Sequence, residues 1–315
     1  MTADQNPVEQ AGAAATDQVD VSGLERSLRH PRALFSFAMS WFTGLVTLFT
    51  LVPLFSVLYL LIVRGGSSLS MAVFTDLPPG AMMPGGGFGN AIVGTILMVA
   101  IAAAISVPTG ILAGVFLADF APDGRTAMAV RFAAKVLTGL PSILAGVFAY
   151  ALVVITTGTF SAPAGGVALS VLMLPIILLT AEESIRSVPA KMREAAIGMG
   201  ATPTQVALRI VIPTALPGIA TGVMLAIARA AGETAPLLFT ALFSEYWMGN
   251  GTPEFLPKGP ADFMKPTASL AVLIYNYSSS PFDNQIELAW AAALVLVVLV
   301  LAVNLAGQAL ARRGS

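Results

Sequence analysis

The stretch WFTGLVTLFTLVPLFSVLYLLIV runs from Trp41 to Val63 and contains 23 residues without a charged side chain. As an α-helix it would be about 34 Å long, which is enough to cross a bilayer core of about 30 Å. Residues 267–277 are also mostly apolar but too few to cross, so we expect an interfacial or re-entrant segment there. Together with five further long apolar stretches, residues 41–63 predict an all-α membrane protein with six transmembrane helices. These five are residues 91–118, 136–155, 166–181, 215–243 and 286–310.

The composition of the whole chain agrees with a membrane protein. Of its 315 residues, 56% are hydrophobic and 10% are charged, and the mean hydropathy is +0.83. A soluble domain usually carries about 25% charged residues, so the composition disfavours soluble enzymes and nucleic-acid binders. The net charge of −1 disfavours a polyanion-binding surface. The chain has no Cys and one His, which excludes a disulfide framework and a zinc site built from Cys or clustered His.

The positions of the basic residues orient the predicted spans. If the N-terminus is cytoplasmic, twelve Lys and Arg residues fall inside and only Arg64, Lys258 and Lys265 fall outside. The positive-inside rule therefore predicts that both termini are cytoplasmic. We expect residues 1–40 to be a disordered cytoplasmic tail, first acidic and then basic, residues 41–311 to be the membrane domain, and residues 312–315 to be a cytoplasmic end.

The cytoplasmic loop SVPAKMREAAIGMGATPTQVALRIVIP, residues 187–213, predicts a helix, a sharp turn and a second helix. Pro189 suits the first turn of a helix, and Gly200 suits the left-handed position that ends one. Thr202-Pro203-Thr204-Gln205 is a capping box, so the second helix is expected to start at Pro203 and run to Pro213. One face of the first helix would carry Met192, Ala195, Ala196 and Met199.

Two roles are open for this first helix on physical grounds. A short cytoplasmic helix with small residues on one face can enter a groove on a partner protein. It can instead lie at the lipid headgroups, held there by its basic residues.

The spacing of the residues in this loop resembles the EAA loop of ABC importer permeases. The resemblance implies a coupling helix that sits in a groove of a separate ATPase. This chain has no P-loop motif, so we expect no ATP site, no enzymatic activity and no cofactor of its own. ATP and magnesium would bind the partner ATPase. The usual Leu before the last Pro is Ile212 here. The residues that match are Glu194, Ala195, Ala196, Gly200, Ile210 and Pro213.

The predicted span 215–243 contains two opposite charges, Arg229 and Glu233. Each charge at the centre of a membrane helix costs roughly 2.5–3.5 kcal/mol, so this span needs partners, water or mutual neutralisation. The two residues are four apart and share one helix face, so they can pair. Pro236 removes the backbone bond to Gly232 and should bend the helix. Charges beside a helix break indicate a transport path; a structural ion pair is the alternative.

Two segments resemble phosphate importer permeases of the ABC class. They are Ala228 to Phe239, whose Ala-Pro-Leu-Leu looks like the PstA-type subunit, and Gly139 to Leu144. The resemblance implies the type I ABC importer permease fold in a bacterial inner membrane. It also implies a PstC-type permease, two copies of a PstB-type ATPase and a PstS-type phosphate-binding protein as partners. Arg229 and Glu233 would act in translocation.

Two other functions stay open from the residues themselves. The chain could be a permease for another oxyanion such as sulfate or molybdate, because an intramembrane cation suits any of them. It could also be an ion-driven secondary transporter that uses Arg229 and Glu233 as a proton relay. An intramembrane enzyme is disfavoured because no Ser–His pair or metal cluster lies in the predicted spans.

Some smaller features also give expectations. The pairs Gly110–Gly114 and Gly218–Gly222 allow close helix contact in lipid, although chance is the alternative in a chain with 29 Gly residues. Glu182 and Glu183 are expected at a solvated helix end. Asp119 and Asp123 are expected in a cytoplasmic turn.

Overall fold

The computed structural model describes residues 31–248 and 259–313. The predicted tail at 1–30 therefore lies outside the described residues. The described residues form helices and contain no strand. The chain divides into two compact units, Met1–Leu58 and Tyr59–Ser315, each of which we describe by itself.

The described part of the first unit is a single helix, α2 (Pro31–Leu60), which continues into the second unit. It begins at Pro31, so the expectation that residues 31–40 belong to the tail is wrong. Proline is favoured in the first turn of a helix, and the apolar run from Leu34 onward continues the membrane pattern. Most of the apolar side chains of α2 are exposed, as expected for a helix that lipid surrounds.

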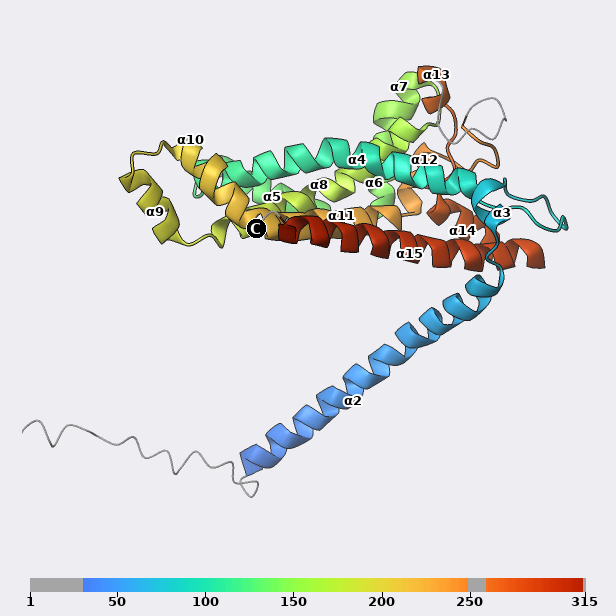
Figure 1. Cartoon of the computed structure of the whole chain (residues 1–315), viewed down its shortest axis with the longest axis horizontal. Coiled ribbons are helices and arrows are strands. Elements are labelled where there is room, and N and C mark those ends of the chain that lie inside the picture. The colour runs from blue at the N-terminus through green and yellow to red at the C-terminus, as the bar shows by residue number, and fades with distance from the viewer. Residues whose placement is uncertain (1–30, 249–258, 314–315) are drawn as a thin grey trace, which may run out of the picture. The chain divides into compact units, whose positions relative to one another are not determined.

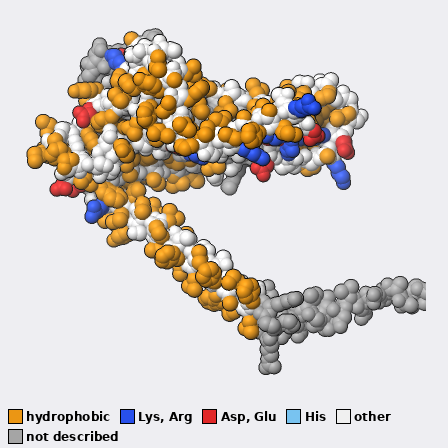
Figure 2. Space-filling model, turned by 180° about the vertical axis from the view of Figure 1, so that it is seen from behind, with side chains coloured by type: hydrophobic (Ala, Val, Ile, Leu, Met, Phe, Trp, Pro, Cys, Tyr) orange, Lys and Arg blue, Asp and Glu red, His pale blue; other side chains and the backbone are white. Residues whose placement is uncertain are grey.

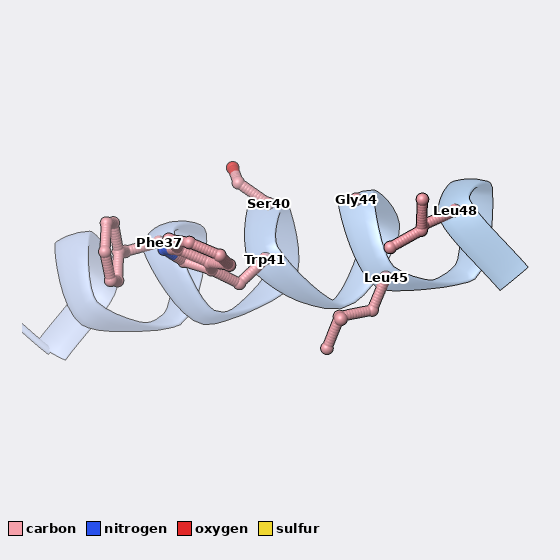
Figure 3. Close-up of a pocket in the computed structure, with 6 residues that line it drawn as sticks. All are labelled: Phe37, Ser40, Trp41, Gly44, Leu45 and Leu48. Atoms are coloured by element: carbon pink, nitrogen blue, oxygen red, sulfur yellow. The ribbon is translucent and has the colours of Figure 1, made fainter.

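A shallow groove runs along the first half of α2 (Figure 3). The rings of Phe37 and Trp41 meet edge to face in it, with centroids 6.1 Å apart. None of its lining residues is charged, so the groove cannot neutralise an anion and suits apolar chains instead. Its lining residues are Phe37, Ser40, Trp41, Gly44, Leu45 and Leu48.

Five described helices are long and apolar enough to cross a membrane, and a sharply bent pair makes a sixth span if it is counted as one. This confirms the predicted all-α membrane fold, although the spans differ in detail from the prediction. The five helices are Ala33–Gly65, Gly89–Phe120, Ala162–Arg186, Pro203–Ala231 and Asp283–Ala309.

The third predicted span, residues 136–155, is wrong as a straight helix. Two helical segments, Arg125–Gly139 and Ser142–Thr157, meet there at 106°. Pro141 disfavours a helical conformation for the residue before it, and Leu140 is extended with φ −72° and ψ 141°. The segments comprise α5 (Arg125–Gly139), α6 (Ser142–Ala149), η4 (Tyr150–Val154) and α7 (Ile155–Thr157).

The fifth span also differs from the predicted residues 215–243. It starts within the loop 187–213 and ends at Ala231, so Pro213 does not end a helix. A π-helical turn ends at Val211, two residues before Pro213; its wider backbone accommodates the proline ring and the missing N–H. The span comprises α10 (Pro203–Val206), η5 (Ala207–Val211) and α11 (Ile212–Ala231), and α12 (Ala235–Thr240) is separate.

Three helices, α4 (Gly89–Val115), α8 (Ala162–Arg186) and α11, form the core of the second unit. Both predicted glycine pairs lie where α4 and α11 press against α8. A Cβ at Gly114 would lie 2.8 Å from the Cβ of Ala181, and one at Gly218 would lie 2.9 Å from that of Ser184. The prediction of close helix contact is confirmed.

We therefore expect Gly114→Leu to destabilise the protein by about 1–3 kcal/mol or more, because the backbone of α8 leaves no room for the side chain. Thermal unfolding in detergent, followed by size-exclusion chromatography, would measure this. Gly44→Leu on α2 is the matched control, because nothing lies within 4 Å of its Cβ position. Equal stability of the two variants would contradict the packing.

Two buried polar side chains of α4, Thr95 and Asn90, form hydrogen bonds with the start of α14 and with the residues that follow α12. The Oγ1 of Thr95 accepts the N–H of Leu270 at 2.9 Å and so caps α14 (Leu270–Ser278). The amide of Asn90 donates to the carbonyls of Ser244 (3.1 Å) and Tyr246 (3.2 Å). A nine-residue α14 agrees with the expectation of a segment too short to cross.

Figure 1 shows α9 and α10 at one end of the second unit, and α3, α13 and α14 at the opposite end. Figure 2 shows a mostly hydrophobic face on which charged side chains gather towards the end of α9 and α10. The remaining elements are η2 (Leu61–Gly65), α3 (Met71–Thr75), η3 (Phe116–Phe120), α9 (Ala190–Gly198), α13 (Pro260–Phe263) and α15 (Asp283–Arg313).

Candidate functional sites

The first candidate site is the break between α11 and α12. The helix ends in two tight backbone hydrogen bonds, from the N–H of Gly232 to the carbonyl of Arg229 (3.1 Å) and from the N–H of Glu233 to the carbonyl of Ala230 (3.2 Å). Pro236 is the second residue of α12, where its missing N–H costs nothing. The predicted bend is thus a full interruption that precedes the proline.

Arg229 and Glu233 pair across this break, as their spacing predicted. The Nε of Arg229 lies 3.3 Å from the Oε1 of Glu233. The arginine side chain is 44% exposed and the glutamate side chain 16%. The pair therefore lies at the surface of the chain, with the carboxylate more enclosed than the guanidinium.

Two other segments contact this break: helix α6 and the residues at the start of α14. A Cβ at Gly146 of α6 would lie 2.6 Å from the Cα of Pro236, so only glycine allows α6 to come so close to α12. On another side, the N–H of Thr267 donates to the carbonyl of Ala241 at 3.0 Å, and the Oγ1 of Thr234 lies 3.5 Å from the carbonyl of Ala271. The break is therefore held by α6 and by the start of α14.

The second candidate site is the loop 187–213. Helix α9 starts directly after Pro189, and Gly200 follows it with φ +87°, a left-handed conformation that favours glycine. In the capping box, the N–H of Thr202 donates to Oε1 of Gln205 (2.9 Å), and the N–H of Gln205 donates to Oγ1 of Thr202 (3.3 Å). The predicted helix, turn and capped second helix are confirmed.

The two adjacent alanines of α9 face different surroundings. Ala196 is 1% exposed and belongs to the hydrophobic core, against which Ile210 also packs. Glu194 and Ala195 are exposed. The exposed surface beside them is apolar and comprises Met192, Ile197 and Met199.

The comparisons with known proteins show the family of this chain. A family described as "Binding-protein-dependent transport system inner membrane component" matches residues 110–314. The phosphate transport system permease protein PstA of Xylella fastidiosa (strain Temecula1 / ATCC 700964) is 38% identical over 294 residues, which cover 93% of this chain and 98% of that protein. The PstA of Yersinia pestis is 36% identical over 281 residues, which cover 89% and 90%.

The chain belongs to the PstA-type permeases of this family. The similarity extends to archaea, because a probable PstA of Methanocaldococcus jannaschii is 33% identical over 260 residues, or 82% of this chain and 88% of that protein.

Solved structures show the fold that this PstA-type permease shares. A chain of a bacterial alginate ABC transporter matches with a TM-score of 0.60 at 16% identity, over 91% of this chain and 98% of that one. A chain of the MetNI methionine ABC transporter in an inward-facing conformation matches with a TM-score of 0.54 at 20% identity, over 72% and 94%. The predicted type I ABC importer permease fold is confirmed.

The structure also reveals charged residues that the sequence analysis placed wrongly. Glu182 is buried, not solvated, and its Oε1 pairs with Nε of Arg131 (2.6 Å) and Nε of Arg186 (3.1 Å). Asp119 lies in η3, not in a turn, and pairs with Arg193 of α9. The signal that could have found Glu182 is its position on a buried face of α8, four residues after Leu178 and three before Ile185.

Proposed function

We propose that this PstA-type permease forms, together with a PstC-type permease, the path by which phosphate crosses a bacterial inner membrane. The observation that supports this is the half-exposed Arg229 at the end of a membrane-spanning helix. A charge that faced lipid near the bilayer centre would cost roughly 2.5–3.5 kcal/mol, so protein or a water-filled cavity must cover this face. The PstC-type permease supplies that cover.

One face of α11 is exposed along the helix, from the loop 187–213 to the break that follows Ala231. Its residues are small, polar or charged apart from one leucine, and they recur every three or four positions, so they form one helix stripe. We assign this stripe to the wall of the path, with Arg229 as its charged end. The stripe comprises Thr214, Thr221, Leu225 and Arg229, with Gly218 at its edge, where α11 contacts Ser184 of α8.

A guanidinium is a suitable transient partner for phosphate, because its planar fork donates two parallel hydrogen bonds to neighbouring oxygens. Glu233 lies beside Arg229 and would hold the cation when no anion is present. Gly232 and Pro236 provide the interruption that lets the pair open and re-form. During translocation, a phosphate oxygen would thus replace the carboxylate of Glu233 as the hydrogen-bond partner of Arg229.

The loop 187–213 connects this path to a pair of PstB-type ATPases, which bind ATP and magnesium; the permease itself needs no cofactor. The exposed residues Glu194 and Ala195 of α9 enter a groove of the ATPase. Helix 203–231 has 29 residues and is about 43 Å long, so it carries movement from the loop to Arg229. A PstS-type protein delivers phosphate from outside. The conformation of this loop depends on four further residues, Ala196, Gly200, Ile210 and Pro213.

Uptake of labelled phosphate into proteoliposomes that contain the four-component complex tests this function. We expect ATP-dependent uptake that unlabelled phosphate suppresses and that equal concentrations of sulfate or molybdate leave unchanged. Stronger suppression by sulfate or molybdate would contradict phosphate as the substrate. Uptake by this chain without an ATPase, driven by a proton gradient, would replace the proposal with a secondary transporter.

The proposed orientation, with both termini cytoplasmic, predicts which cysteines a membrane-impermeant reagent can reach. The chain has no native Cys, so single-cysteine variants have no background. Ser279→Cys, at the end of α14, should react with an impermeant maleimide in intact spheroplasts. Ser187→Cys, at the end of α8, should react only after the membrane is permeabilised. The reverse pattern would invert the topology.

A further inference from the structure

Arg193 connects α9 to two other helices through one guanidinium. Its Nη1 pairs with Oδ1 of Asp119 in η3, the π-helical continuation of α4. Its Nη2 donates to the carbonyl of Ile185 in the last turn of α8 at 2.7 Å. Both charged side chains are mostly enclosed, at 25% and 10% exposure. The contact is therefore better shielded from water than a typical surface ion pair.

The elements that Arg193 contacts are themselves tied together by Arg131 of α5. Its Nε donates to Oε1 of Glu182 at 2.6 Å, its Nη1 to the carbonyl of Pro122 at 2.8 Å, and its Nη2 to the carbonyl of Leu117 at 2.9 Å. The carbonyls at a helix end lack partners within the helix, and a cation there stabilises them. The cytoplasmic ends of α4, α5 and α8 are thus held as one body. We call Asp119, Arg131, Glu182, Arg186 and Arg193 the cytoplasmic clamp.

We infer that Arg193 is a positioning residue that makes α9 move together with the cytoplasmic ends of α4 and α8. Movement of α9 would then be transmitted to α4 and α8 through the Asp119–Arg193 pair. It would also be transmitted to α11 through the backbone that connects the two helices. Among the described residues, this pair is the one ion pair that joins α9 to another helix. The inference rests on the proposed docking of α9 to an ATPase.

The experiment measures how much phosphate is transported for each ATP hydrolysed. The full complex is reconstituted in proteoliposomes with Arg193→Gln, Asp119→Asn or both. We expect each single variant to lower this ratio about tenfold, the effect of one charge-assisted hydrogen bond, while the ATPase still copurifies. The double variant should be no worse than either single variant, because both remove the same pair.

A conservative variant and a control sharpen the result. Arg193→Lys keeps the charge but cannot reach Asp119 and the Ile185 carbonyl with one planar fork, so its ratio should be intermediate. Arg125→Gln removes an exposed cation that has no described ion pair and should leave the ratio unchanged.

An unchanged ratio in Arg193→Gln would overturn the inference. If uptake and ATP hydrolysis both stayed at the wild-type level, Arg193 would have no role in coupling, and if both fell in parallel, its role would be structural only. If the wild-type complex neither binds an ATPase through α9 nor transports phosphate, the proposed function itself fails. That failure would already be visible before any clamp variant is made.

Discussion

Replacement of Arg229 by glutamine is expected to lower phosphate uptake by about 10- to 100-fold while the complex still assembles. The change removes a charge-assisted hydrogen bond to the anion, which is worth roughly 1.5–3 kcal/mol. Arg229 lies at the surface of the chain, half exposed, so its loss leaves no cavity in the core. Initial rates of labelled phosphate uptake in proteoliposomes, divided by the amount of complex recovered, would measure the effect.

Two further variants make the result specific. Arg125→Gln removes the same charge from an exposed position outside the break, and this variant should transport normally. Glu233→Gln removes the carboxylate partner but leaves the cation, so it should lower uptake less than Arg229→Gln. Wild-type uptake in Arg229→Gln, or equal losses of assembly in both pair variants, would mean that the pair is only structural.

Glu194→Lys is expected to reduce the amount of ATPase that copurifies with the permease by at least about tenfold. Glu194 is exposed on α9, and reversing a charge inside a complementary interface costs several kcal/mol. The buried Ala196 keeps α9 attached to the core, so the membrane domain should stay folded. Quantitative affinity purification in mild detergent would measure the ATPase-to-permease ratio.

Glu183→Lys is the matched control for this variant. It reverses the same charge at an exposed position on α8, outside the proposed docking surface. It should copurify with the ATPase at the wild-type ratio. An equal loss of ATPase from both variants would indicate a general charge effect, and no loss from Glu194→Lys would place the docking surface elsewhere.

Features that depend on neighbours in the chain were predicted well. The capping box at Thr202 and Gln205 and the left-handed Gly200 need only residues within one or two turns. The pairing of Arg229 with Glu233 was expected from their spacing of four residues, and the pair forms although the helix ends between them. The glycine pairs were recognised as contact points, although the sequence did not show that both contact α8.

Features that depend on distant residues were predicted poorly. Glu182 was expected to be solvated, yet its partner Arg131 is 51 positions away in the sequence. Asp119 and Arg193 are 74 positions apart. Neither pair leaves a local pattern, because the residues meet only when α5, α8, α9 and the end of α4 pack together.

The sequence by itself determined that this chain is an all-α membrane protein with a helix–turn–helix in the loop 187–213 and an ion pair at a broken helix. Apolar length, helical period and capping chemistry act locally, so they can be read from consecutive residues. Only the tertiary structure decided the 106° angle at the break in span three, the continuation of the helix from Pro203 past Pro213 into span five, and the contacts by which Arg193 joins α9 to α4 and α8. These features result from packing between helices, which brings together residues that the chain keeps far apart.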